Sequence, residues 1–138
     1  MTVAAMSVPE SAVPLRLAAK VPRGDSEMIS ARTLASVPYP VEINDLPALV
    51  YRHHTGRQFA EMIVDQFDEM LAQSRKYPLV FSVALHPFVI GRPHRLRAFR
   101  DAVRHIMAHR DALWITTPGE IARYCETLPK GTVPGSEG

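Results

Sequence analysis

Two stretches of the chain repeat apolar residues at intervals of three and four, the spacing that places side chains on one face of an α-helix. The first stretch predicts a helix over Thr55 to Lys76, and the second predicts a helix over about Pro93 to His109. Thr55 and Gln58 form a capping box at the start of the first helix, and Pro93 suits the first turn of the second. The predicted inward positions are Phe59, Met62, Ile63, Phe67, Met70 and Leu71 in the first helix, and Leu96, Phe99, Val103, Ile106 and Met107 in the second.

Between these helices lies an apolar run without a helical period, Leu79 to Leu85. A nearly continuous apolar run of this length predicts a strand that is buried on both faces, as in a parallel sheet. Shorter strands are predicted at Thr33 to Val37 and at Leu113 to Thr116. Pro38-Tyr39-Pro40 forces an extended path, because each proline disfavours helix at the residue before it, and Val41 to Ile43 should continue that path.

The predicted elements alternate from strand to helix three times, which is typical of α/β proteins with parallel strands. The last helix is predicted from a second capping box, Thr117 to Glu120, with proline at the first helical position. Three parallel strands leave two open edges, and so narrow a sheet is hard to cover on both faces. We therefore expect a piece of a larger α/β barrel or sheet, or a chain that assembles with itself or with a complementary N-terminal chain.

Both ends of the chain lack apolar periodicity. Pro9, Pro14 and Pro22 would interrupt any helix near the N-terminus. We expect a disordered or irregular arm over residues 1–30, the folded part over residues 31–128, and a flexible tail over residues 129–138.

Composition narrows the classes of partner. The 138 residues carry a formal net charge of +2, and the arginines are scattered without interleaved aromatic residues, so we predict no nucleic-acid partner. No apolar run is long enough to span a bilayer, and the N-terminus lacks the features of a secretory signal. The single Cys125 excludes an intrachain disulfide and fits a reducing compartment. These features predict a cytoplasmic protein with no membrane partner.

A polar residue, His86, follows the buried apolar run and precedes Pro87. In parallel α/β folds, chemistry takes place at the carboxyl ends of strands. Histidine has a reference pKa of about 6.5, which suits proton transfer near neutrality. His86 is therefore either a general acid or substrate-binding imidazole, or a capping residue bonded to the loop backbone.

Four further residues are candidates for substrate binding: Tyr39, Asn44, Asp45 and Arg92. Asn44 and Asp45 follow an extended segment, and they either reach the same mouth as His86 or form a turn that caps a helix. Tyr39 lies between two prolines and is either a substrate-facing aromatic residue or a packed residue of the rim. Arg92 lies beside a helix N-terminus, where anions bind readily, and is either a carboxylate ligand or an ordinary surface arginine.

His105 and His109 form a His-x-x-x-His pattern on the second predicted helix, a spacing that can place two imidazoles on one metal ion. The pattern is short, and only Asp101 and Asp111 are near enough in sequence to complete a site. We read these histidines as part of a solvated face, predict no metal site in this chain, and expect only weak binding of divalent metal. His53 and the histidine that follows it are read as a polar loop.

Several short motifs occur in a specific order between Leu34 and Tyr124. They are Ser36-Val37-Pro38-Tyr39-Pro40, Glu42-Ile43-Asn44-Asp45, the Phe59 to Leu71 helix, Leu85-His86-Pro87, Gly91-Arg92-Pro93, Trp114, Thr116 and Glu120-Ile121-Ala122. In this order they resemble the polysaccharide deacetylase family. The resemblance points to the branch that includes bacterial peptidoglycan deacetylase-like proteins and allantoinase-like enzymes.

The resemblance implies an irregular (β/α) barrel that hydrolyses N-acyl groups or cyclic amides. In many members an Asp and two His hold a divalent metal such as zinc, and a second Asp acts as the base. A histidine near the C-terminal end acts as the acid or polarises the oxyanion, and His86 matches it. Ala84 stands where the family usually has leucine.

Residues 1–32 match none of the family's early motifs, namely Asp-Asp, His-x-x-x-His and an arginine-containing motif. The resemblance therefore implies an α/β partial barrel with about three parallel strands alternating with helices. Its function would be hydrolysis of non-peptide C–N bonds in carbohydrate metabolism, incomplete and inactive alone, with no cofactor held by this chain. The alternative is a non-catalytic association partner, or a truncated gene product that keeps only this piece of the fold.

Overall fold

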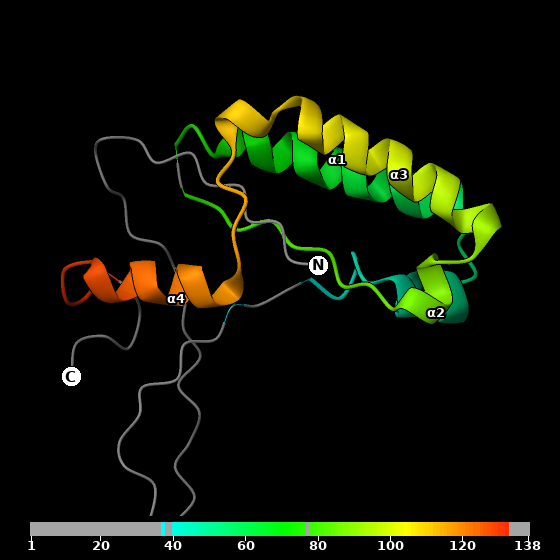
Figure 1. Cartoon of the computed structure of the whole chain (residues 1–138), viewed down its shortest axis with the longest axis horizontal. Helices are drawn as coiled ribbons and strands as arrows, with labels where there is room; N and C mark the ends of the chain where they lie inside the picture. The colour runs from blue at the N-terminus through cyan, green and yellow to red at the C-terminus, as the bar shows by residue number, and fades with distance from the viewer. Residues whose placement is uncertain (1–36, 38–39, 77, 133–138) are drawn as a thin grey trace, which may run out of the picture.

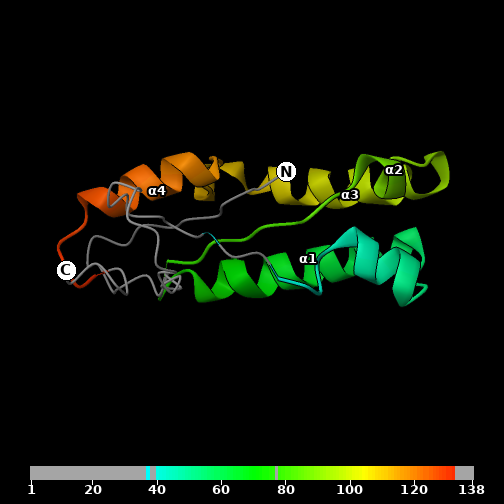
Figure 2. The same cartoon turned by 90° about the horizontal axis from the view of Figure 1, so that it is seen from below.

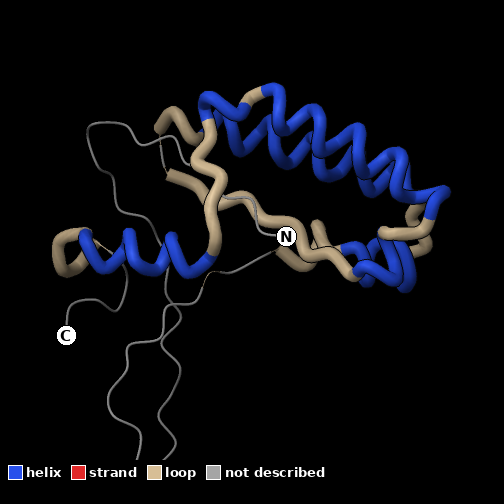
Figure 3. The backbone as a smooth tube through the Cα atoms, viewed as in Figure 1, coloured by secondary structure: helices blue, strands red, loops and turns tan. Residues whose placement is uncertain are grey.

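A computed structural model describes residues 37, 40–76 and 78–132, and helices dominate this part of the chain (Figures 1 and 3). The helical elements are the π-helix η1 (Leu46–Tyr51), α1 (Gly56–Gln73), α2 (Pro87–Ile90), α3 (Pro93–Ala108), the 3-10 helix η2 (Arg110–Ala112) and α4 (Pro118–Thr127). None of the helices in the described ranges combines the length and apolar character needed to cross a membrane.

The two long helices, α1 and α3, lie side by side and run in the same direction (Figures 1 and 2). At their first turns, a Cβ placed on Gly56 would lie only 2.9 Å from the Cα of Arg95. Toward their last turns, Asp68 contacts His105. Parallel neighbours require a connection that returns along their length, and residues 78–86 provide it.

This returning segment packs against the helix pair and supplies part of the core. Phe81 and Val83 are buried, and the ring of Phe81 makes an edge-to-face contact with Phe67 of α1 at a centroid distance of 5.7 Å. The centre of the apolar run therefore packs against α1 without forming a sheet. The buried core cluster comprises Ile43, Ala48, Leu49, Phe59, Ala60, Ile63, Phe67, Phe81, Val83, Val89, Ile90, Ala102 and Ile106.

Both predicted capping boxes are present. The Thr55 hydroxyl accepts a hydrogen bond from the Gln58 amide at 3.2 Å, and the Gln58 side chain accepts one from the Thr55 amide at 2.9 Å. Thr117 and Glu120 make the same exchange at the start of α4, at 3.3 and 2.9 Å. Each box satisfies backbone donors that a helix N-terminus otherwise leaves without a partner.

The predicted partial (β/α) barrel with about three parallel strands is wrong. The described residues contain no sheet, and their β-pairing consists of one isolated parallel bridge between Asn44 and Ala84. A strand needs a ladder of hydrogen bonds, and here the bridge makes two, from the Ala84 amide to Ile43 and from the Asp45 amide to Ala84, each 3.1 Å long.

The predicted strands at 79–85 and 113–116 are therefore segments without a ladder, and 41–43 is a bend and turn. We expected association of chains through the unpaired edges of these strands. The described residues have no such sheet edge. Assembly with a second copy or a complementary chain stays a prediction. The strand predicted at 33–37, apart from residue 37, and the N-terminal arm lie outside the described residues.

The predicted helices match α1 and α3 to within a few residues, but their inward faces do so only in part. Phe59, Ile63 and Phe67 are buried as expected, whereas Met107 is 38% exposed. Three short helices, η1, α2 and η2, were not predicted, because six, four or three residues are too few to show a period.

The last helix, α4, follows an extended segment over residues 113–117 (Figure 1). The rings of Trp114 in this segment and Tyr124 in α4 make an edge-to-face contact at a centroid distance of 5.7 Å. Ile121 is fully buried on the inner face of the helix. The contact between Trp114 and Tyr124 therefore ties α4 to the segment that precedes it.

We predict that Gly56→Ala destabilises the chain. Alanine's better helix propensity is worth at most about 1 kcal/mol, whereas pushing two packed backbones apart costs typically about 1–3 kcal/mol. The added methyl would meet the backbone of Arg95, so the packing cost should exceed the gain in propensity. Chemical denaturation measures the difference in the free energy of unfolding.

Gly119→Ala in the first turn of α4 is the matched control, since the nearest atom to its new Cβ, on the Arg123 side chain, is 3.7 Å away. We expect this variant to be neutral or stabilised by up to about 1 kcal/mol. Equal effects at the two glycines would contradict the close approach of α1 and α3.

The start of α4 should weaken in acid. Hydrogen bonds from the Thr116 hydroxyl and from the Thr117 amide and hydroxyl hold the pKa of Glu120 below its ordinary value of 4.5. Because the folded-state pKa is depressed, the stability that ionised Glu120 contributes is fully present above pH 4.5 and is lost as the pH falls through the folded pKa. Glu120→Gln keeps a capping side chain but cannot ionise, so the stability difference between wild type and variant should shrink in acid. A difference that is independent of pH would contradict this role of the carboxylate.

Candidate functional site

The single parallel bridge positions the two residues of the candidate site. It holds Asn44 beside Ala84, so the chain on each side then continues to Asp45 and His86. One carboxylate oxygen of Asp45, Oδ2, accepts a hydrogen bond from the His86 backbone amide at 2.8 Å. The other, Oδ1, lies 2.7 Å from the ring atom Nδ1 of His86. Both oxygens of one carboxylate thus hold one histidine.

Burial distinguishes the two partners of this pair. The Asp45 side chain is 0% exposed, whereas that of His86 is 34% exposed. Because a carboxylate only accepts hydrogen bonds, the contact assigns a proton to Nδ1 of the ring. Among the described residues no hydrogen bond to Nε2 occurs, so the second ring nitrogen is left for a partner at the surface.

The turn after His86 keeps the imidazole at the edge of the fold. Pro87 starts the short helix α2, and a Cβ on Gly91 at its end would lie only 2.3 Å from the Pro87 carbonyl oxygen, so this tight turn requires glycine. Arg95 of α3 donates a hydrogen bond to the Val89 carbonyl at 3.0 Å and ties α2 to α3.

Phe88 adds an apolar surface beside the imidazole. Its side chain is 66% exposed, and its ring centroid lies 5.5 Å from that of His86. Phe88 was not predicted from sequence, although its place two residues after His86 in a short turn was a signal for it.

The other residues predicted to bind substrate lie in different settings. Asn44 accepts a hydrogen bond from the Leu46 amide through Oδ1 at 3.1 Å, as the predicted capping turn requires. Arg92 is exposed at the N-cap of α3. Tyr39 lies outside the described residues. Asp45 lies at the site, but both of its oxygens are engaged by His86, and substrate contact by all four residues stays a prediction.

His53 and Cys125, which were also considered from sequence, have structural explanations. His53 is exposed and adopts a φ of 57°, which fits a turn in the polar loop before α1. Cys125 is half-buried, and burial raises the pKa of its thiol, so it lacks the lowered pKa of a nucleophilic thiolate.

The divalent metal that the resemblance implies does not fit the Asp45–His86 pair. Asp45 is fully buried with both oxygens occupied, so only Nε2 of His86 could serve as a ligand. Among the described residues, a group with metal-ligand chemistry lies near the C-terminal ends of α1 and α3, formed by Asp68, His105 and His109. Helix α3 rises about 1.5 Å per residue, so His105 lies roughly 18 Å along the helix axis from Pro93, the first residue of α3. This group is therefore far along α3 from the end of the helix that follows His86.

Two known proteins are similar to part of this chain. Over 92 residues, 65% of this chain, it is 28% identical to a Schizosaccharomyces pombe protein named "Putative polysaccharide deacetylase". Over 91 residues, 60% of this chain, it is 29% identical to a peptidoglycan deacetylase of Helicobacter pylori. This chain is similar to polysaccharide deacetylases.

The similarity is partial in two respects. The matched regions span 28% and 30% of the lengths of these two relatives. No protein-family model matches the chain. The comparisons therefore support a deacetylase-like relationship, without distinguishing the peptidoglycan deacetylase-like and allantoinase-like branches.

We predict that Asp45→Asn reverses the proton position on His86. An asparagine NH₂ group donates to Nδ1 where the carboxylate accepted from it, so the neutral ring should carry its proton on Nε2 in the variant. Imidazole ¹⁵N chemical shifts and couplings report this tautomer directly. We also expect a loss of stability of about 1–3 kcal/mol, because a charged acceptor of two hydrogen bonds is replaced by a neutral amide.

The imidazole of His105, which contacts a different carboxylate through Nε2, is the internal control and should keep its ¹⁵N pattern. An Nδ1-protonated His86 in the Asp45→Asn variant would contradict the assignment.

Proposed function

We propose that this chain supplies the proton-donating histidine of a hydrolase that removes N-acyl groups from a carbohydrate, acting on non-peptide C–N bonds. The observation that supports the proposal is the pair of hydrogen bonds between the buried Asp45 carboxylate and His86. The carboxylate holds the ring by Nδ1 and leaves Nε2, on a side chain that is 34% exposed, available to a substrate. The similarity to polysaccharide deacetylases supports the choice of reaction.

The chemistry of amide hydrolysis explains why such a histidine is useful. Water adds to the acyl carbon, the carbonyl oxygen gains negative charge, and the C–N bond then breaks with transfer of a proton to nitrogen. The products are a carboxylic acid and an amine. Protonated His86 would give its Nε2 proton to the departing nitrogen, while Asp45 acts as a positioning residue that holds the ring.

Among the described residues, Asp45 is the one carboxylate that hydrogen-bonds to His86. Residues 1–32 lack the Asp-Asp and His-x-x-x-His motifs. The base that activates water and any metal that assists it must then come from outside the Asp45–His86 pair. We therefore propose that the chain works together with residues on a complementary polypeptide or on a longer form of the protein, and that it is inactive alone.

The substrate class follows from the relatives and from the exposed ring beside the histidine. The relatives are named as deacetylases of polysaccharide and of peptidoglycan. Phe88 offers an apolar face of the kind on which the C–H face of a sugar ring packs. An acetamido sugar polymer is therefore the substrate that we propose, with acetate as the product.

The test is release of acetate from N-acetylglucosamine oligomers. We expect none from this chain alone, and release when it is combined with, or fused to, a polypeptide that carries the Asp-Asp and His-x-x-x-His motifs. In the active combination, His86→Gln should lower kcat by roughly 10²–10⁴-fold, the usual contribution of general acid–base catalysis, with a smaller change in KM.

His53→Asn is the matched control, since His53 is exposed and asparagine tolerates its positive φ. This variant should keep kcat within twofold. Acetate release by the isolated chain that survives His86→Gln would contradict the proposed role of His86, and so would an inactive result in every combination.

A further inference from the structure

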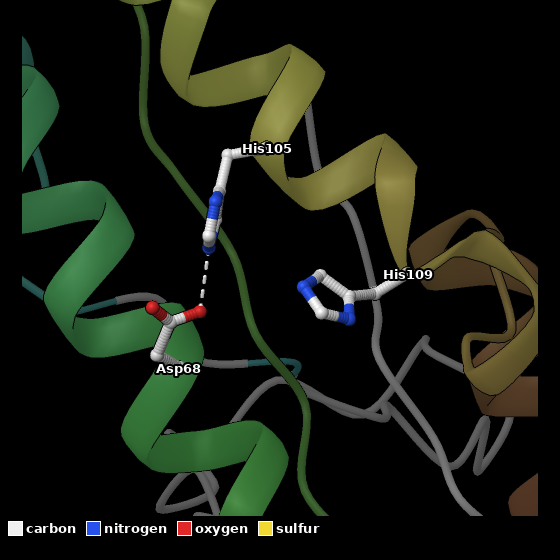
Figure 4. Close-up of side chains that lie close together, drawn as sticks. All are labelled: Asp68, His105 and His109. Atoms are coloured by element: carbon white, nitrogen blue, oxygen red, sulfur yellow. Dashed lines mark hydrogen bonds and ion pairs between the residues drawn. The ribbon is translucent and has the colours of Figure 1, made fainter.

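We propose that Asp68, His105 and His109 form a binding site for a first-row divalent metal ion of the Zn²⁺ class, which clips α1 to α3. The three side chains come from two helices and point toward one another (Figure 4). One ligand atom from each lies within 4.8 Å of the others. This site is separate from the Asp45–His86 pair and from the metal motifs that the family resemblance places before Thr33.

The distances are close to those that a tetrahedral ion needs. Zinc bonds to His nitrogen and carboxylate oxygen of about 2.0–2.1 Å put neighbouring ligand atoms about 3.3 Å apart. Nε2 of His105 already lies 2.7 Å from Oδ1 of Asp68, and the ring centroids of His105 and His109 are 5.4 Å apart. Asp68 and His109 are exposed, so small side-chain rotations can open the hydrogen bond and admit the ion.

The ring of Phe67 packs against both imidazoles and helps to order them. Phe67 is fully buried, and its ring centroid lies 6.1 Å from that of His105 and 5.7 Å from that of His109. Phe67 precedes Asp68 in α1, so the same helical turn supplies both the aromatic contact and the carboxylate ligand. Ordered ligands lose less conformational entropy when they bind a metal ion.

The direction of the two helices favours a cation at this place. Because α1 and α3 run in the same direction, their C-terminal ends lie at the same end of the pair. Helix C-termini carry partial negative charge, and cations near the last turn are stabilised. His105 is in the last turn of α3, and His109 is the C-cap of that helix.

The donor set favours a borderline transition metal. Two imidazoles and one carboxylate suit Zn²⁺, Ni²⁺ and Cu²⁺ better than Ca²⁺ or Mg²⁺, which take oxygen ligands. Three protein ligands leave a fourth position for water. The third ligand could not be found from neighbouring sequence, because Asp68 is 37 residues away on α1, whereas the nearby Asp101 pairs with Arg104 at 2.7 Å.

The experiment is titration of the full chain with ZnCl₂ by calorimetry, repeated with CoCl₂ while the visible d–d absorption of cobalt is recorded. We expect one ion per chain, a tetrahedral cobalt spectrum, and a rise in Tm with zinc concentration, since an ion that binds only the folded state stabilises it. His109→Ala and Asp68→Asn should each weaken zinc binding at least tenfold and remove the rise in Tm.

His94→Ala is the matched control, because His94 is an exposed histidine on α3 outside the cluster, and it should bind zinc as the wild type does. His86→Gln should also retain zinc, which separates this site from the proposed function. The Asp68→Asn variant is compared with wild type without metal by circular dichroism, to show that both are folded. Zinc affinity that is unchanged in His109→Ala and Asp68→Asn, or lowered equally in His94→Ala, would overturn the proposal.

Discussion

The buried carboxylate of Asp45 joins segments that are 41 residues apart in the chain. Its side chain is shielded from solvent, and both of its oxygens contact His86. A buried carboxylate without partners would be costly, so the two bonds from His86 are what makes its position tolerable. The backbone bridge between Asn44 and Ala84 sets the register of the two segments. One isolated bridge therefore fixes the register of the two segments, as a complete ladder of hydrogen bonds does in a sheet.

The parallel arrangement of α1 and α3 determines where chemistry can gather. Neighbouring helices that run the same way bring both N-termini to one end and both C-termini to the other. The His86 turn leads directly into the start of α3, and the cluster of Asp68, His105 and His109 lies toward the other end. The segment that returns between the helices connects the two ends and fills the core with Phe81 and Val83.

Local features of this fold could be predicted from sequence, and features that depend on distant partners could not. The capping boxes at Thr55 and Thr117 involve residues three apart, so the chain specifies them by itself. The run from 79 to 85 predicted burial, and its centre, Phe81 to Val83, is buried, whereas its other residues are half-buried. An apolar segment can pack against helices as well as against strands, and the sequence pattern does not distinguish the two.

The candidate site shows the same division. The place of His86 at the end of an apolar run was evident from sequence, whereas its nearness to Asp45 was one of two interpretations, the other being a capping turn. That both carboxylate oxygens bind the same histidine follows from the register of the bridge, which no local pattern records. The relation of Asp68 to His105 and His109 depends on how two helices lie side by side, so the spacing within α3 revealed only two of the three residues.

Trp114 is the only tryptophan in the chain, and its edge contact with Tyr124 makes it a natural optical reporter. Its emission reflects whether α4 is seated on residues 113–117, and excitation of the nearby tyrosine can pass to it. Quenching measurements would therefore follow the C-terminal helix separately from the α1–α3 pair, whose core contains phenylalanine rings but no indole. A biphasic melt, with an early change in fluorescence and a later loss of helical circular dichroism, would show that α4 undocks before the helix pair unfolds.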